Sequence, residues 1–387
     1  MKKIQGISKG KWIRMRGQVR LVVPIFVIVI MFPFYFFGQN VAVDLADWRN
    51  NAPRVFFDVL LLGQGPLVYH LKLSEKFGGM DVPEEQTLNN PVDISVDREG
   101  IVFVLDSKDN DIKVFQKNGA FIKKLGRGGS GPGEFQRPWT LEIIQGQLYV
   151  VDTGNGRVQI LDKDGRYLKS YKMPLNYGWG LAFDSMGNIY VNTVGFRSKK
   201  IISFHDQRGN LVGEIGELEG QAFEYYDFTS IKAQIRKGQL PDSFKNELIL
   251  AIDREGNLWA VHRALNKVRK YSAKGELLTV LKIEAGEFKK IYQTYRKQNE
   301  EVENMPATYY SLNYVSDLAI DSKGNLYVLL NEPSQMIVYV FSKEGALKKK
   351  LLGVDDHITR ICISDKNVLY ALGYETHFIY KFLLNQE

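Results

Sequence analysis

Paired glycine turns recur along the chain at almost fixed spacing. The first turn of each pair contains Gly100, Gly146, Gly187, Gly256 or Gly324, and the second contains Gly119, Gly165, Gly209, Gly275 or Gly345. The two turns of a pair are 19 to 22 residues apart, whereas successive pairs are separated by 22 to 49 residues. Glycine suits these turns because tight hairpins need positive φ angles. The chain therefore repeats a rigid unit of two hairpins, joined by links of variable length.

Each unit has the pattern of four strands, and repeated four-stranded units of about 40 residues are typical of β-propellers. Five units are complete, but the sixth has only three strands, at 358–363, 368–372 and 378–384. The segment 67–78 supplies the fourth, because its Glu-Lys-Phe-Gly end matches the last strands of earlier units. We therefore predict an all-β, six-bladed propeller over residues 67–387. Its N-terminal strand closes the last blade and so removes an exposed sheet edge.

Two stretches of the first two units, 129–138 and 150–159, resemble the NHL-repeat family of six-bladed propellers. The later units keep the turns but lose the Asn-x-Arg pattern that Asn155 and Arg157 form. The resemblance implies the propeller fold. It leaves the function open, since such propellers include binding modules, extracellular sensor domains and some lyases.

The N-terminal region is typical of a membrane anchor. Residues 1–20 carry seven cations and no acid, and the 18 residues 21–38 contain no charged side chain. Such a run is at the lower limit for a membrane-spanning helix, and the positive-inside rule places the cations in the cytoplasm. We therefore predict a basic cytoplasmic tail over 1–20, a transmembrane anchor over 21–38 and a stalk over 39–66. The propeller would then be periplasmic or extracellular.

A cleaved signal peptide is the alternative, but the residues after the apolar run lack the paired small residues that cleavage needs. The absence of Asn-x-Ser/Thr sequons and the compact layout favour a bacterial source.

The charge balance of the chain indicates whether nucleic acid is an expected partner. Lys and Arg total 51 against 44 Asp and Glu, and without the seven cations of the tail the balance is 44 against 44. Nucleic acid is therefore not expected as a partner, since binding to phosphates needs clustered cations. The single cysteine, Cys362, excludes an internal disulfide and a thiolate zinc cluster.

Aligning the first strands of the six units predicts two rings around the central axis. One ring is mostly small and contains Ser95, Ile143, Ala182, Ala251, Ala319 and Cys362. The ring two residues earlier contains Asp93, Leu141, Gly180, Ile249, Asp317 and Arg360. Units five, six and one are neighbours, so Asp317, Arg360 and Asp93 should lie side by side in the channel as an Asp–Arg–Asp bridge. The alternatives are a catalytic carboxylate pair or a calcium site, which would need more oxygen ligands.

Other candidate sites have a plainer explanation. The Gly-rich segment 126–133 lacks the Gly-Lys-Ser/Thr ending of a phosphate loop, so we interpret it as a loop between units. His262, His357 and His377 map to one face, and amidating lyases of similar architecture bind zinc through histidines of several blades. Here, however, His262 belongs to unit four, two units from the unit of His357 and His377, and loops between second and third strands lie away from the axis. The three are therefore not expected to converge as a zinc site requires. We therefore predict no metal and no cofactor.

Two long links, 217–242 and 284–313, depart from the repeat and are rich in aromatic residues. The spacing of Phe288, Tyr292 and Tyr295 predicts a helix over 286–303 with one aromatic face. Both links join a fourth strand to the next first strand, so they should leave the propeller on the same face and touch each other. The tyrosines outside the helical stripe are our candidate partner-binding residues, namely Tyr225, Tyr226, Tyr309 and Tyr310.

We therefore predict a membrane-anchored extracytoplasmic propeller that binds a protein, peptide or glycan partner through one face. The alternative is an enzyme, a metal-dependent lyase or lactonase that acts in the central channel. The binding interpretation is favoured because the predicted axis offers two acids and an arginine but no set of histidines. No catalytic residue can be assigned.

Overall fold

The computed structural model describes residues 66–172 and 180–384. The tail, the anchor and almost all of the stalk predicted from the sequence lie outside these residues. Among the helices of the described part, none is both long enough and apolar enough to cross a membrane.

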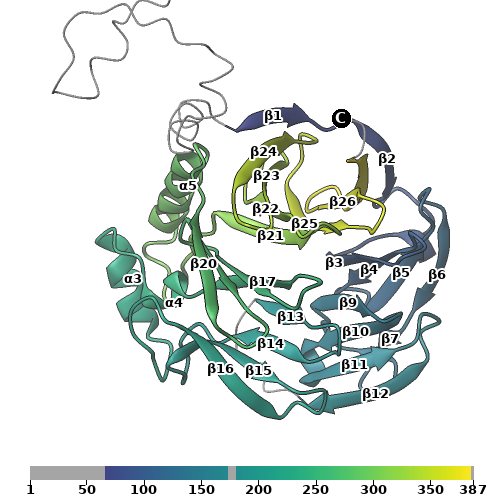
Figure 1. Cartoon of the computed structure of the whole chain (residues 1–387), viewed down its shortest axis with the longest axis horizontal. Coiled ribbons are helices and arrows are strands. Elements are labelled where there is room, and N and C mark those ends of the chain that lie inside the picture. The colour runs from purple at the N-terminus through teal and green to yellow at the C-terminus, as the bar shows by residue number, and fades with distance from the viewer. Residues whose placement is uncertain (1–65, 173–179, 385–387) are drawn as a thin grey trace, which may run out of the picture. The chain divides into compact units, whose positions relative to one another are not determined.

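Six sheets, each built on four antiparallel strands, form a ring around a central axis (Figure 1). In each blade the first strand is the innermost. The blades are as follows: blade one, β3 (Pro91–Val96), β4 (Val102–Asp106), β5 (Asp111–Phe115) and β6 (Phe121–Leu125); blade two, β9 (Thr140–Ile144), β10 (Gln147–Asp152), β11 (Arg157–Leu161) and β12 (Tyr167–Lys172); blade three, β13 (Leu181–Phe183), β14 (Ile189–Asn192), β15 (Lys200–His205) and β16 (Leu211–Glu217); blade four, β17 (Leu248–Ile252), β18 (Leu258–His262), β19 (Lys267–Tyr271) and β20 (Leu277–Lys282); blade five, β21 (Val315–Ile320), β22 (Leu326–Leu330), β23 (Ile337–Phe341) and β24 (Leu347–Leu352); blade six, β25 (Ile358–Ile363), β26 (Val368–Gly373) and β27 (Phe378–Leu383). A short pair, β7 (Arg127–Gly128) and β8 (Glu134–Phe135), lies between blades one and two. The predicted six-bladed fold is confirmed.

The N-terminal segment closes the ring, but as two strands rather than one. Strand β2 (Leu73–Gly78) pairs antiparallel with β27 and completes blade six, as predicted. Strand β1 (Leu67–His70) instead pairs parallel with β24 and adds a fifth strand to blade five. Between them, the Leu71 amide donates to the Leu352 carbonyl at 2.7 Å. The segment is therefore a strap across two blades, visible in Figure 1 where purple strands meet yellow ones.

The Asn-x-Arg pattern fixes the link into blade two. The buried Asp152 carboxylate accepts from the Gln136 amide at 2.7 Å and from Arg157 Nε at 2.9 Å. Arg157 Nη2 in turn donates to the carbonyls of Gly131 and Glu134. These contacts hold the Gly-rich link between blades one and two, which sets where the inner strand β9 begins.

The two long links form one helical layer beside blade four. The first contains α3 (Phe228–Arg236) and α4 (Asp242–Lys245), which the sequence analysis did not predict, and the second contains α5 (Phe288–Glu301), close to the predicted range. Ile231 and Ile235 of α3 share a hydrophobic cluster with Ile291 and Tyr295 of α5. The predicted contact between the links is therefore confirmed. We call the face of the propeller that carries them the insert face.

Candidate functional site

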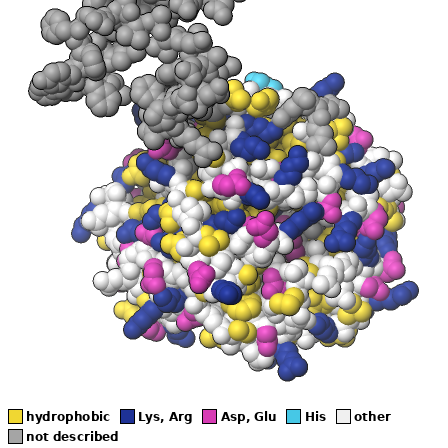
Figure 2. Space-filling model, viewed as in Figure 1, with side chains coloured by type: hydrophobic (Ala, Val, Ile, Leu, Met, Phe, Trp, Pro, Cys, Tyr) yellow, Lys and Arg dark blue, Asp and Glu magenta, His cyan; other side chains and the backbone are white. Residues whose placement is uncertain are grey.

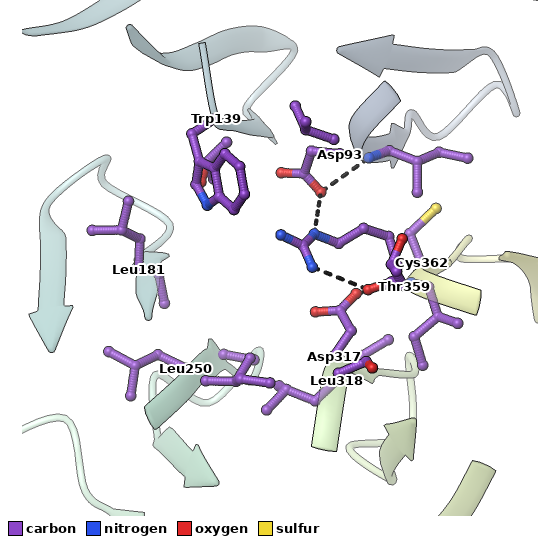
Figure 3. A pocket seen from close by; sticks show the side chains of 18 of the residues that line it. Asp93, Trp139, Leu181, Leu250, Asp317, Leu318, Thr359 and Cys362 are labelled. Atoms are coloured by element: carbon purple, nitrogen blue, oxygen red, sulfur yellow. Dashed lines mark hydrogen bonds and ion pairs between the residues drawn. The ribbon is translucent and has the colours of Figure 1, made fainter. Parts of the chain in front are cut away.

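A cavity of about 770 Å³ occupies the centre of the ring and is lined by the inner strands of all six blades (Figure 3). Because these strands all run in the same direction, their side chains form three levels. The level nearest the insert face contains Asp93, Thr140, Ile249, Asp317 and Arg360. The middle level contains Ser95, Glu142, Ala182, Ala251, Ala319 and Cys362. The third level lies one residue farther along each strand and contains Val96, Ile143, Phe183, Ile252, Ile320 and Ile363, which border the cavity while they pack in the clusters between blades.

The rings predicted from the sequence are wrong in blade two by one residue. Tyr149 pairs with Glu142, as Phe103 pairs with Ser95 in blade one, so Glu142 and not Ile143 belongs to the middle level. For the same reason Thr140 replaces Leu141, which is buried between blades one and two.

This shift of one residue arises because the turn between the first two strands is shorter in blade two. Blade two turns through Gln145 and Gly146, which both have positive φ angles of 50° and 78°. In blade one, Asp97 ends the first strand and accepts from the amides of Glu99 and Ile101 across a longer turn. The absence of such an aspartate in blade two was the sequence signal that could have revealed Glu142.

The structure brings Asp93, Asp317 and Arg360 together at the level nearest the insert face. Figure 3 labels the two aspartates. Arg360 Nε lies 3.8 Å from Asp93 Oδ1, and its guanidinium lies 5.8 Å from the centre of the Trp139 ring. Asp317 Oδ2 accepts from the Ile361 amide at 2.8 Å, as Asp93 Oδ2 accepts from the Leu141 amide at 2.8 Å. Each aspartate thus ties its own blade to the next one. Among the described residues, Arg360 forms its ion pair with Asp93.

Burial controls the protonation of these acids. It raises the pKa of Asp93, and it raises the pKa of Asp317 to about 7 although the nearby Arg360 guanidinium acts in the opposite direction. Asp317 is therefore partly protonated near neutral pH.

Glu142 is the residue that the sequence analysis missed. It is the one long side chain in a level of small ones, and its carboxylate is accessible from the cavity although protein walls surround it. It makes no hydrogen bond or ion pair with any described residue. Burial, together with the negative charges of Asp93 and Asp317, raises its pKa to about 8.

A second charged pair lies at the mouth of the cavity. The Arg263 amide donates to the Glu247 carbonyl at 2.9 Å, which places both side chains at the insert-face end of blade four. Burial raises the pKa of Glu247 to about 7, against the effect of Arg263. Arg263 Nε is buried and has no hydrogen-bond partner among the described residues. Neither residue belongs to the regular repeat, which is why the sequence pattern did not indicate them.

The four candidate tyrosines have different environments. Tyr225 and Tyr310 are exposed, at 74% and 44% of their surface. Tyr226 is half-buried and its ring lies 4.9 Å from that of Phe223, while Tyr309 is half-buried and lies 5.5 Å from Phe244. Tyr226 and Tyr309 therefore contribute to the packing of the links. Tyr225 and Tyr310 remain exposed and available to contact a partner.

The three histidines each have a separate partner. Nδ1 of His262 contacts the Lys245 carbonyl and Nδ1 of His377 the Leu88 carbonyl, both at 2.7 Å. Nε2 of His357 lies 3.3 Å from Asn331 Oδ1. In the part of the chain that the structure describes, no three His, Cys, Asp or Glu side chains are grouped so that they could hold a metal ion.

Comparison with known proteins identifies the fold. Residues 82–204 match the family DUF5128, described as a 6-bladed beta-propeller. Protein brain tumor of Drosophila melanogaster is 25% identical over 154 residues, which cover 39% of this chain and 14% of that protein. Peptidyl-glycine alpha-amidating monooxygenase B of Xenopus laevis is 41% identical over 91 residues, which cover 21% of this chain and 10% of that protein. The chain thus spans only a small part of the length of these relatives.

Among solved structures, a putative exported protein of Bacteroides fragilis NCTC 9343 aligns with a TM-score of 0.52 and 14% identity. The alignment covers 82% of this chain and 98% of that one. At such identity the likeness concerns the fold alone. Together these matches establish a six-bladed β-propeller, without singling out the NHL-repeat family among such propellers.

Proposed function

We propose that the protein is a membrane-anchored, extracytoplasmic binding module that recognises a protein, peptide or glycan partner through its insert face. The observation that carries this proposal is the distribution of exposed aromatic rings. Seven aromatic side chains are exposed in the described part of the chain, and Tyr69 and Tyr167 lie on outer strands. The other five belong to the links or to the blade-six loop on the same face, namely Tyr225, Phe228, Tyr292, Tyr310 and Tyr374.

Exposed aromatic residues that gather on one face are typical of binding surfaces, because large rigid rings bury much area at little entropic cost. Two of these rings, Tyr310 and Tyr374, also line the cavity. A partner on this face would therefore cover the cavity mouth. Figure 2 shows cationic and anionic side chains interspersed over the face in view.

The enzyme alternative would require a metal-dependent lyase or lactonase site at the channel. Such a site needs at least three protein ligands that converge on one point. In the cavity, Asp93 instead pairs with Arg360, and both Asp93 and Asp317 accept from backbone amides. Glu142 has no such partner among the described residues. The binding function is therefore the better supported of the two.

The experiment replaces Tyr225 and Tyr310 by Ala together in the full chain and measures site-specific photo-crosslinking to partners in intact cells. We expect the crosslinks to be lost while the melting temperature is unchanged, since both rings are exposed. The matched control is Tyr167→Ala, on the outer strand β12, which should crosslink as the wild type does. Retained crosslinks in the double variant would contradict the proposal.

A further inference from the structure

We propose that the central cavity binds an organic cation, a primary ammonium or guanidinium on an alkyl stem such as a lysine or arginine side chain of a peptide, with Glu142 as its counter-charge. This inference deepens the proposed binding function and rests on it, since it assigns a ligand chemistry to the cavity beneath the insert face.

The first argument is the charge of the cavity wall. The described residues that line the cavity include four carboxylates but only two cationic side chains, Arg263 and Arg360. Arg360 pairs with Asp93 at 3.8 Å, and Arg263 lies beside Glu247, whose pKa it lowers. Asp317 shares Arg360 with Asp93, and Glu142 has no ion pair with any described residue. Ionised carboxylates in a protein-walled cavity attract a cation strongly, because the field between them is poorly screened.

The second argument is the position of these two acids. Glu142 belongs to blade two and Asp317 to blade five, which are opposite blades of a six-membered ring. Their side chains therefore enter the cavity from opposite walls, and a cation between them would interact with both. That they interact across the cavity is also indicated by the effect of Asp317, which helps to raise the pKa of Glu142.

The third argument is the shape of the surroundings. At the level of Glu142 the other five side chains are small, namely Ser95, Ala182, Ala251, Ala319 and Cys362, so that space remains in front of the carboxylate. Between this level and the mouth, the wall is mixed. Leu181, Leu250 and Leu318 border the cavity there, as Figure 3 shows, beside the polar level of Asp93, Asp317 and Arg360. An alkyl stem can pack against these leucines while its charged end reaches Glu142.

The fourth argument is the direction of access. At the far end of the channel, Arg254 of blade four forms an ion pair with Asp365 of blade six. These blades are not neighbours, so the pair reaches across part of the far opening. Asp365 also lies 3.9 Å from Arg98 of blade one. These pairs narrow the far opening, which favours access from the insert face, where the proposed partner would present its basic side chain.

The experiment measures binding of short blocked peptides to the purified full chain by isothermal titration calorimetry at pH 8. The probe is acetyl-Gly-Lys-Gly-amide, compared with the same peptide carrying Arg, norleucine or acetyl-lysine. We expect the Lys and Arg peptides to bind and the two neutral peptides to bind at least tenfold more weakly. Binding should release protons, measured from titrations in buffers of different ionisation enthalpy, because a bound cation lowers the pKa of Glu142.

The test variant is Glu142→Gln, which keeps the shape of the side chain and removes its charge. We expect it to bind the Lys peptide at least tenfold more weakly and to lose the proton release. The matched control is Glu99→Gln, which removes an exposed carboxylate on the far face that pairs with Lys163. It should bind as the wild type does. Thermal melting of both variants confirms that they are folded.

Equal affinity for the lysine and norleucine peptides, or unchanged binding by Glu142→Gln, would overturn the inference. So would an absence of binding up to 10 mM peptide. Crosslinking of Tyr225→Ala/Tyr310→Ala is scored separately, so a failure of the cation site is distinguished from a failure of the insert face as a binding surface. If peptides bind as expected but the crosslinks survive, the cation site stands and the tyrosines are not the contact.

Discussion

Replacing Arg360 by Met removes a cation that lies beside both Asp93 and Asp317 at the level nearest the insert face. Arg360 Nε lies 3.8 Å from Asp93 Oδ1, a separation worth ~4 kcal/mol at an effective dielectric constant of about 20. The two side chains keep 23% and 17% of their surface exposed, so water screens part of this attraction. We therefore expect the free energy of unfolding to fall by ~2–3 kcal/mol at pH 8.

The loss should depend on pH. Arg360 lowers the pKa of both Asp93 and Asp317, so without it both pKa values rise further above their ordinary value. The folded variant then binds more protons than the unfolded chain between about pH 4 and the raised pKa values, and its free energy of unfolding falls as the pH rises through this window. At pH 5, protonation relieves the repulsion, and the loss should be smaller than at pH 8.

Differential scanning calorimetry of the full chain at pH 5 and pH 8 measures this difference. A domain of this size loses about 2 °C of melting temperature per kcal/mol, so we expect a decrease of about 4–6 °C at pH 8. The control is Arg254→Met, which removes an arginine from an exposed ion pair with Asp365 and should change little. An equal decrease at both pH values, or none at either, would refute the electrostatic reasoning.

Three further predictions follow from the strap, a buried histidine and the N-terminal region. Deleting residues 67–78 removes β1 and β2 and should give aggregates in size-exclusion chromatography, because two sheet edges are exposed. Replacing only residues 67–70 by Gly and Ser should leave a monomer. A monomeric protein after the full deletion would contradict the closure of the ring by this segment. Burial lowers the pKa of His262 to about 4, so the free energy of unfolding should fall as the pH drops from about 6.5 to 4, by up to ~3 kcal/mol. Denaturant titrations should find this fall missing in His262→Gln, and an identical fall in the variant would exclude His262 as its cause. A reporter fused after Glu387 that is active only in the cytoplasm should be silent, and activity there would refute the predicted topology.

The repeat was readable from the sequence because it is a local property. A glycine at each hairpin and a nearly constant distance between the two hairpins reflect strands and turns that form within one blade. Gly100 and Gly119, for example, have φ angles of 91° and 81°, which other residues rarely adopt. The number of blades and the use of the N-terminal strand in blade six follow from counting these units. The same holds for α5, since the spacing of Phe288, Tyr292 and Tyr295 is a periodicity within one helix.

The register of the inner strands could not be read in this way. A turn one residue shorter moves every side chain of a strand to the opposite side, so the loss of one residue between Ile144 and Gly146 exchanged Ile143 for Glu142 at the axis. For a related reason, the sequence could not predict which of the four candidate tyrosines are exposed. Tyr226 and Tyr309 resemble Tyr225 and Tyr310 in sequence context, and only the packing of the two links against each other separates them.

The sequence by itself determined the propeller, its six blades, its closure by the N-terminal strand and the face from which the long links leave. Only the tertiary structure decided which side chains meet at the axis. Glu142 and Asp317 are 175 residues apart in the chain and come to opposite walls of one cavity because the ring closes. Burial raises the pKa of both, and the charge of Asp317 raises that of Glu142 further. Neither effect exists before the six blades are assembled.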